Sequence, residues 1–191
     1  DLEQARAHIG RADELTARIG ARRFHSETLA FRAEVEHLAG NTDLAWRLGA
    51  EALEDARVVA PAYLGPLVAG VCLAFAPLDR IAAIVAEGER MLTSTALSHN
   101  HLFFFKGAME AMLRQGDWEG AEAFADRLDA KFSAEPALHM RLLSRRARLI
   151  AALGRRPGDE ASRGALADFA RDARQAGYAA LACWPERLLA A

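Results

Sequence analysis

The chain has 191 residues, of which 52% are hydrophobic and 26% charged, a balance typical of a folded globular protein rather than a disordered one. Its formal net charge of −2 gives no basic field that would attract nucleic acid, so we expect no nucleic-acid partner. The longest apolar run, LVAGVCLAFAPL, is shorter than the roughly 20 residues that a membrane-spanning helix needs, so we expect no membrane association.

Apolar residues recur at the spacing of an α-helix along the whole chain and predict ten helices. Runs of β-branched residues with strand-like alternation are absent, so the predicted fold class is all-α. The predicted helices cover residues 2–19, 22–39, 43–59, 62–75, 78–95, 99–115, 117–133, 136–153, 159–176 and 178–190. The stripe predicted along one face of the second helix consists of Phe24, Thr28, Phe31, Val35 and Leu38. The stripe predicted for the fifth helix consists of Ile81, Ile84, Val85, Gly88, Met91 and Leu92.

The first residues, DLEQARAHIGRADEL, lack a Met and already follow helical periodicity, so we expect the chain to be a piece of a longer protein. Cys72 and Cys183 both lie in apolar stretches, far apart in the sequence. Two such cysteines are typical of buried thiols in a reducing compartment rather than of a disulfide framework. We therefore expect both thiols to be buried and the protein to be cytoplasmic.

An aspartate begins the second helix of each predicted pair, at Asp43, Asp79, Asp117 and Asp159, and these are 36, 38 and 42 residues apart. An aspartate there can accept hydrogen bonds from the free N–H groups of the first helical turn. The breaks between pairs follow a similar period and lie at Gly20, Pro61, Ser98, Pro136 and Gly177. A helix pair with this repeat length predicts an α-solenoid of about five antiparallel helix pairs, forming a single domain over residues 1–191. The alternative is a helical bundle without repeats, whose loops would also contain Gly and Asp.

The stretch Gly116-Asp117-Trp118 shows the expected roles of the residues between two helices. Gly116 would end one helix in a conformation with positive φ, and Asp117 would cap the next. Trp118 would pack back on its partner helix, and Ala121 would allow the close approach that two antiparallel helices require. The order Gly-Asp-aromatic-x-x-Ala resembles the second half of a tetratricopeptide repeat. The preceding FKGAMEAML supplies the core positions of that repeat's first helix at Phe105, Ala108, Met109 and Met112.

A wider resemblance covers residues 95–157. The residues that carry it are Ser98-His99-Asn100, Phe104, Ala108-Met109-Glu110, Gly116-Asp117-Trp118, Glu135-Pro136 and Ala151-Ala152-Leu153-Gly154-Arg155. This segment resembles the C-terminal tetratricopeptide-like repeats of bacterial signalling ATPases, in which a class III adenylate or guanylate cyclase domain precedes a regulatory ATPase. The closing ARDARQAGYAALACW is similar to repeats in ATP-dependent transcription activators of related architecture. The resemblance implies a sensing or assembly module whose catalytic domains lie outside this chain.

Two stripes of side chains are candidate partner-binding residues. Arg141, Arg145 and Arg148 follow the spacing i, i+4, i+7 and would lie along one face of a helix. Their guanidinium groups could bind an anionic ligand or the acidic surface of a protein or peptide partner. The alternative is a solvated face whose arginines pair with acids of a neighbouring helix.

The second stripe consists of Phe103, Lys106 and Glu110. In the tetratricopeptide register these residues face the concave groove, where such repeats bind their partners, and an exposed Phe beside mixed charges suits a peptide. Alternatively, the FFF run at 103–105 is buried between adjacent repeats. If equivalent helices line one wall of a solenoid, the two stripes would form one continuous patch.

Catalytic and metal-binding motifs are missing from the sequence. His99 and His101 are two residues apart, so on a helix they would point apart, and SHNH is better explained by Ser98 as a helix N-cap. The chain has no glycine-rich phosphate loop, no H-E-x-x-H and no nucleophile elbow. We therefore expect no enzyme activity, no metal and no cofactor.

The function expected from these observations is that of a non-catalytic interaction or regulatory module of a larger signalling ATPase. Its partner would be a protein or peptide, or another domain of the same chain. Two alternatives remain: a structural arm that forms homo-oligomers, and a small-molecule sensor domain.

Overall fold

The computed structural model describes residues 1–59, 61–92 and 96–190, and every regular element in these ranges is a helix. The elements are α1 (Leu2–Arg18), the short 3-10 helix η1 (Arg22–Phe24), α2 (His25–Leu38), α3 (Thr42–Val59), α4 (Gly65–Leu73), α5 (Leu78–Met91), α6 (Ser98–Gln115), α7 (Trp118–Lys131), α8 (Leu138–Arg155), α9 (Glu160–Gln175) and α10 (Ala179–Ala190). The chain forms two compact units, Asp1–Ala111 and Met112–Ala191, with the boundary inside α6. The predicted all-α fold of consecutive helix pairs is confirmed, and a single domain over residues 1–191 stays a prediction.

Most predicted helix limits lie close to the observed ones, with three exceptions. The helix predicted for residues 22–39 is divided, because η1 precedes α2. The helix predicted for residues 62–75 is shorter, and Pro66 lies in the first turn of α4, where its missing N–H costs no helical hydrogen bond. The helix predicted for residues 78–95 ends at Met91, and residues 93–95 lie outside the described residues.

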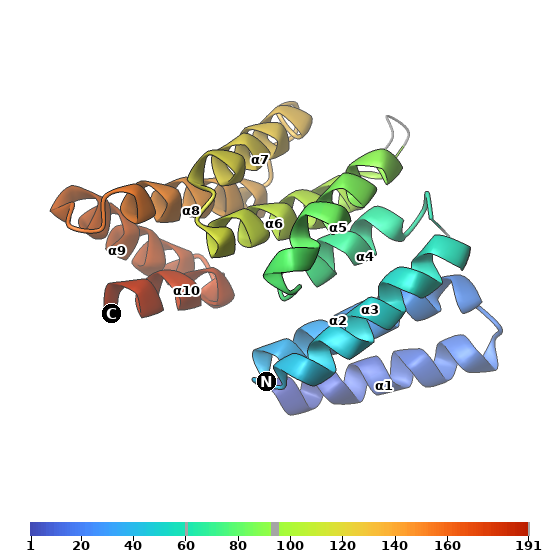
Figure 1. Cartoon of the computed structure of the whole chain (residues 1–191). Coiled ribbons are helices and arrows are strands. Elements are labelled where there is room, and N and C mark those ends of the chain that lie inside the picture. The colour runs from blue at the N-terminus through green and yellow to red at the C-terminus, as the bar shows by residue number, and fades with distance from the viewer. Residues whose placement is uncertain (60, 93–95, 191) are drawn as a thin grey trace. The chain divides into compact units, whose positions relative to one another are not determined.

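In the first unit, consecutive helices pack against each other from α1 to α5, and α2 also contacts α4 (Figure 1). The first helices of successive pairs thus touch, as they do in a solenoid. The part of α6 in this unit joins the same contacts, because the Phe103 ring meets the Phe31 ring of α2 edge-on, with 5.7 Å between centroids. Lys106 of α6 also reaches α2, where its Nζ lies 3.1 Å from a carboxylate oxygen of Glu34.

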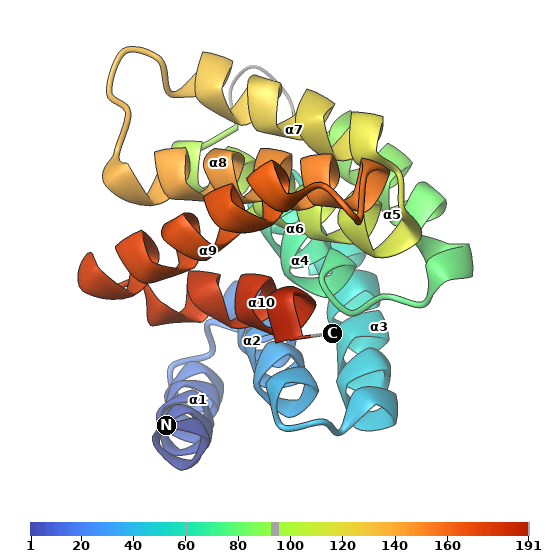
Figure 2. The same cartoon turned by 90° about the vertical axis from the view of Figure 1, so that its left-hand side faces the viewer.

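The second unit repeats this pattern. Helix α7 packs on α8, α8 on α9 and α9 on α10, and α8 also contacts α10 (Figure 2). Each helix therefore packs on the next helix in the chain, and α8 and α10, the first helices of successive pairs, also contact each other. None of the described helices combines the length and the apolar character needed to cross a membrane.

Glycines end four of the helices in the left-handed backbone region. Gly20, Gly40, Gly116 and Gly177 have φ between +68° and +87°. After α6, the N–H of Asp117 donates to the carbonyl of Met112, and the N–H of Gly116 donates to that of Leu113. These two hydrogen bonds satisfy two carbonyl groups that the helix end would leave free, and they require a positive φ at the glycine. The role predicted for Gly116 is confirmed.

Only two of the four predicted aspartate caps are N-caps. Asp117 accepts a hydrogen bond from the N–H of Gly120, and Asp159 accepts one from the N–H of Ser162. Asp43 and Asp79 instead lie inside the first turns of α3 and α5. In α5 the reason is Pro77, which takes the N-cap position so that the helix begins before Asp79. Both aspartates still lie at the positive end of the helix dipole.

One further prediction about a helix end needs correction, and Trp118 makes a contact beyond the predicted one. Ser98 is the first residue of α6 rather than the residue before it. The Trp118 ring packs on α8, a contact that the sequence did not predict: a Cβ placed on Gly154 would lie 2.5 Å from the ring. Gly154 therefore leaves the space that Trp118 occupies. Ala121, predicted at a close helix contact, has no exposed surface.

The stripe predicted for α2 is only partly buried. Leu38 is 66% exposed, and of the predicted positions only Val35 is buried. The buried residues of α2 are Ser26, Leu29, Ala30, Ala33, Val35 and Glu36. Because α2 contacts α1, α3 and α4, small residues occupy much of its buried surface, and these carry a weak apolar signal in the sequence. In α5, Ile81, Ile84 and Gly88 of the predicted stripe are buried, and Val85, Met91 and Leu92 are half-buried.

The cysteines differ in their surroundings. Cys72 is completely buried, and burial raises the pKa of its thiol, as expected for an inert core residue. Cys183 is exposed, which contradicts the prediction. Helix α10 buries Leu181, Ala182 and Pro185, and Cys183 lies outside that stripe. Both thiols are free.

Helix α4 is buried at all nine positions and meets the backbone of α6 directly. A Cβ placed on Gly107 of α6 would lie 1.8 Å from the carbonyl oxygen of Gly70 in α4. A Cβ placed on Gly70 would lie 2.3 Å from the carbonyl oxygen of Phe103. Beside this contact, the Phe104 ring fills the space above Gly88 of α5. Glycine is thus required by the close approach of two helices, not by a turn.

We expect Gly107→Ala to destabilise the protein by about 1–3 kcal/mol, because the methyl group meets backbone that cannot rotate away. Gly10→Ala in α1 is the matched control, since a Cβ there meets nothing within 4 Å. The control should stabilise the helix by about 0.5–1 kcal/mol. Urea unfolding of both variants measures these differences. Equal stability of Gly107→Ala and the wild type would contradict the close contact.

An ion pair between Arg6 and Glu36 links α1 to α2. Arg6 donates from Nε and Nη2 to the two carboxylate oxygens of Glu36, at 2.9 and 3.2 Å. Glu36 is 7% exposed and also accepts a hydrogen bond from Asn41. The hydrogen bonds from Arg6 and then Asn41 lower the pKa of Glu36 to about 2.

The contribution of Glu36 to stability should therefore depend on pH. Its pKa is lower in the folded state than in the unfolded chain, so its stabilisation is complete above about pH 5 and is lost as the pH falls towards 2. We expect Glu36→Gln to be less stable than the wild type near neutral pH, and this difference to shrink as the pH is lowered through that range. Urea unfolding of both proteins across the range tests this. A difference that stays constant down to about pH 2.5 would rule out the depressed pKa.

Candidate functional site

A groove in the second unit lies between α7, α8 and the segment that connects them. Its volume is about 440 Å³. The lining residues are Leu128, Asp129, Phe132, Pro136, Met140, Arg141, Arg145 and Arg148. The volume lies in the range of ligand-binding clefts, about 300–1,000 Å³. All three arginines predicted to bind a partner line this one groove.

The helical spacing of α8 brings these arginines together. Arg141, Arg145 and Arg148 lie on one face of the helix, as their sequence spacing predicts. The opposite side of α8 is buried and includes Leu142, Leu143, Ala147 and Ile150. The three arginines therefore share one face, as predicted. Which of their charges are neutralised depends on the acids that face them from neighbouring helices.

Arg148 is held by two acids of α7. One of its terminal nitrogens lies 2.6 Å from an oxygen of Asp126 and 2.7 Å from an oxygen of Asp129. The hydroxyl of Ser144 donates to the other oxygen of Asp129, at 2.6 Å. Further along α8, Arg155 pairs with Glu122 of α7. The acids of α7 thus neutralise both arginines and link the two helices.

Arg145 is paired as well, but with α9. Its Nη1 lies 3.3 Å from a carboxylate oxygen of Asp172, and its guanidinium carbon lies 5.5 Å from the centroid of the Phe169 ring. Arg145 and Arg148 thus pair with acids of neighbouring helices, as the alternative explanation of the stripe states, and their role in partner binding stays a prediction. About half of each side chain or less remains exposed.

Arg141 has no ion pair or hydrogen bond to another side chain in the described part of the chain, and it is exposed. It lines the groove, as does Met140, the residue before it in α8. Phe132, which is half-buried, and Pro136, which is exposed, add apolar surface to the same groove. The groove therefore offers one available guanidinium group beside an apolar wall.

Sequence reasoning missed the apolar wall. Phe132 and Pro136 lie at and beyond the end of α7, and Met140 lies one position before Arg141. The spacing of Met140, Ser144 and Arg148, i, i+4 and i+8, shows that a single helix face carries all three, so Met140 could have been found from the sequence. Phe132 and Pro136 could not, because their place beside α8 depends on how the connecting segment folds back.

Another arginine of α8 lies away from the groove. Arg146 is 5% exposed, and its guanidinium carbon lies 6.0 Å from the centroid of the Trp184 ring in α10. Burial lowers the pKa of Arg146 to about 10. Because Arg146 is buried within the second unit, it has a structural role and offers no surface to a partner.

The stripe of Phe103, Lys106 and Glu110 belongs to the first unit. Phe103 is half-buried against Phe31, and Lys106 is paired with Glu34, so both contact α2. Within the FFF run, Phe104 and Phe105 are buried. Glu110 is also half-buried. Much of this stripe is thus engaged in packing, and its union with the arginine stripe in one patch stays a prediction.

The histidines of α6 point apart, as expected for positions two residues apart. His101 is 8% exposed, and its ring lies near that of Phe105, whereas His99 is exposed. Within the described ranges, no three His, Cys, Asp or Glu side chains are close enough to share a metal ion.

No family model, curated protein or solved structure matches this chain. The resemblance to the repeats of signalling ATPases therefore stays a prediction.

The ion pairs of α8 predict unequal effects of neutralising its arginines. Arg148→Gln should lower the free energy of unfolding by up to about 1 kcal/mol, because it removes a partly exposed pair and leaves Asp126 and Asp129 close together. Arg141→Gln, the control, should leave stability unchanged. The difference between the variants should shrink in high salt, which screens exposed charges. Denaturant unfolding at two salt concentrations measures it, and equal losses for both variants would contradict the pairing described.

Proposed function

We propose that the chain is a non-catalytic interaction module of a larger signalling ATPase, and that the groove between α7 and α8 binds a partner segment. That segment carries an acidic residue next to a large apolar residue. It belongs to another protein or to another domain of the same chain. The observation that carries this proposal is the available guanidinium of Arg141 beside the apolar wall of the groove.

The charges of the groove set the number of acidic groups it can bind. Arg148 has two carboxylate partners and Arg145 has one, so neither needs a further anion. Arg141 can donate two parallel hydrogen bonds to one carboxylate. A strongly acidic segment would meet Asp126, Asp129 and Asp172, which repel it. These charges favour a segment with a single acidic side chain at the contact.

The apolar wall supplies the second part of the recognition. Phe132 and Met140 are half-buried, and Pro136 is exposed, so a large apolar side chain could cover them and be removed from water. Met side chains adapt to ligands of different shape because their thioether chain is flexible. An apolar anchor beside one charge-assisted pair is a common arrangement at protein interfaces.

The fold supports an interaction module of this kind. Helix-pair repeats stack through their small buried residues and leave other faces free to vary for binding. The sequence has no phosphate loop, metalloprotease motif or nucleophile elbow, which supports a role without catalysis.

Selection of peptides from a random phage-displayed library with the purified chain tests the proposal. We expect enriched peptides to share an acidic residue next to a large apolar one. Arg141→Glu should weaken binding of an enriched synthetic peptide at least about tenfold, because it replaces a charge-assisted hydrogen bond with repulsion. Arg156→Glu, an exposed arginine outside the groove, is the matched control and should bind normally. Enrichment of peptides whose binding does not change in Arg141→Glu would reject this site.

A further inference from the structure

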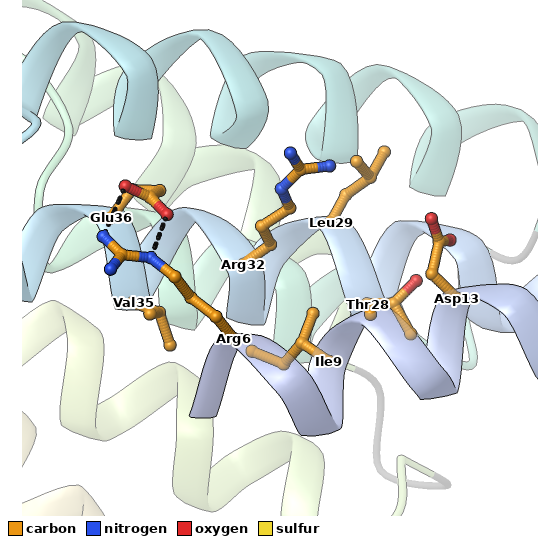
Figure 3. A pocket seen from close by; sticks show the side chains of 9 residues that line it. Arg6, Ile9, Asp13, Thr28, Leu29, Arg32, Val35 and Glu36 are labelled. Carbon is orange, nitrogen blue, oxygen red and sulfur yellow. Dashed lines mark hydrogen bonds and ion pairs between the residues drawn. The ribbon is translucent and has the colours of Figure 1, made fainter. Parts of the chain in front are cut away.

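A second pocket lies in the first unit, between α1 and α2. Its volume is about 270 Å³, just below the range of sites for drug-sized ligands. The residues that line it are Arg6, Ile9, Gly10 and Asp13 of α1 and Thr28, Leu29, Arg32, Val35 and Glu36 of α2 (Figure 3). Cations, anions and apolar side chains are all present in this small space.

The two helices run antiparallel, with an ionic contact near each end of the pocket. Arg6 binds Glu36 at one end, and Asp13 lies 3.3 Å from Nδ1 of His25 at the other. Figure 3 shows Glu36 and Asp13 at opposite ends, with Val35 beside Glu36 and with Ile9, Leu29, Thr28 and Arg32 between the ends. The pocket therefore has an ionic contact at each end and, between them, apolar side chains together with Thr28 and Arg32.

Arg32 is the arginine of the pocket without a hydrogen bond or ion pair, although the charge of Glu36 attracts it through space. In the described part of the chain its side chain makes no hydrogen bond or ion pair, whereas Arg6 is held by Glu36 and Glu3. In Figure 3 the dashed lines join only Arg6 and Glu36, and Arg32 stands between Leu29 and Glu36. Asp13 is half-exposed and has only the long contact with His25. Each of these two residues can therefore bind an opposite charge.

Gly10 lines the pocket. It lies inside α1, where a glycine lowers helix stability by about 0.5–1 kcal/mol relative to alanine. A Cβ at Gly10 would meet nothing within 4 Å, so no neighbouring atom requires a glycine there. A larger side chain at this position would occupy the pocket, which gives a way to block it without a backbone clash.

We propose that this pocket binds a small zwitterion whose carboxylate and ammonium groups are at opposite ends. The carboxylate pairs with Arg32, the ammonium pairs with Asp13, and the apolar body between them lies on Ile9, Leu29 and Val35. This assignment concerns the first unit alone and does not depend on the groove between α7 and α8.

The helical spacing sets the length of this ligand. Arg32 lies seven residues beyond His25, the partner of Asp13, which corresponds to about 10 Å along the axis of α2. Both side chains can lean towards each other, so the two charges of the ligand are separated by several ångströms. In an α-amino acid the ammonium and carboxylate groups are bonded to the same carbon, so they cannot reach Asp13 and Arg32 at once. A linear ω-amino carboxylate and a short apolar peptide with free termini both can.

Calorimetric titration of the whole chain with defined probes tests this proposal. The probes are 6-aminohexanoate, hexanoate, hexylamine, leucine and the dipeptide Ala-Ala. We expect 6-aminohexanoate or Ala-Ala to bind at least about tenfold more tightly than the three probes that lack separated opposite charges. The tighter of the two identifies the source of the ligand as an ω-amino carboxylate or a peptide. No binding by either, or equal binding of hexanoate and 6-aminohexanoate, would overturn the proposal.

Three variants locate the binding. Gly10→Leu should abolish binding of the tighter probe, and Arg32→Gln should weaken it at least about tenfold. Arg18→Gln, in the last turn of α1 and outside the pocket, is the control and should bind like the wild type. Asp13→Asn should make the tighter probe bind no better than hexanoate, and this comparison remains valid if Gly10→Leu does not fold. Unchanged binding in Arg32→Gln and Asp13→Asn would show that the probe binds elsewhere and would overturn the assignment.

Discussion

The close approach of α4 and α6 at Gly70 and Gly107 is the constraint on which the packing of the first unit depends. Helices with larger side chains at their contact lie about 8–10 Å apart, and a side chain at either glycine would force such a distance here. Other contacts of α6 depend on its position, including the Phe104 ring above Gly88 and the pair between Lys106 and Glu34. A shift of α6 would disturb all of them, because packed helices move as rigid elements.

In the second unit, ion pairs between helices decide which charges remain available for binding. The acids of α7 hold Arg148 and Arg155, and Asp172 of α9 holds Arg145. These partly exposed pairs contribute little to stability, but they fix the positions of long side chains that would otherwise be mobile. Arg141 is left as the arginine of the groove that can bind a new carboxylate. A stripe of three equal cations in the sequence thus becomes a site with one binding group.

The two candidate sites share an arrangement of residues but suit different ligands. Each combines a guanidinium that lacks an ion pair, Arg141 or Arg32, with apolar surface from two helices. The groove of the second unit is larger and has exposed Pro136 at its wall, which suits a segment of polypeptide. The pocket of the first unit is smaller and has Asp13 at its far end, which suits a compact ligand with two opposite charges. A module with both sites could bind a small molecule in one unit and a partner in the other.

The sequence by itself determined the helices, their repeat length and several of their ends. These features depend on local chemistry: apolar spacing within one helix, positive φ at Gly116, and the carboxylate of Asp117 that accepts a hydrogen bond within its own turn. It also predicted that Arg141, Arg145 and Arg148 share a face, because a single helix sets that spacing. Tertiary structure decided the exposure of Leu38 and Cys183, the role of Gly107, the pairing of Arg145 and Arg148, and the pocket beside Arg32. Each of these depends on which residues of a different helix lie opposite, and contacts between distant parts of the chain leave no periodic signal in one sequence.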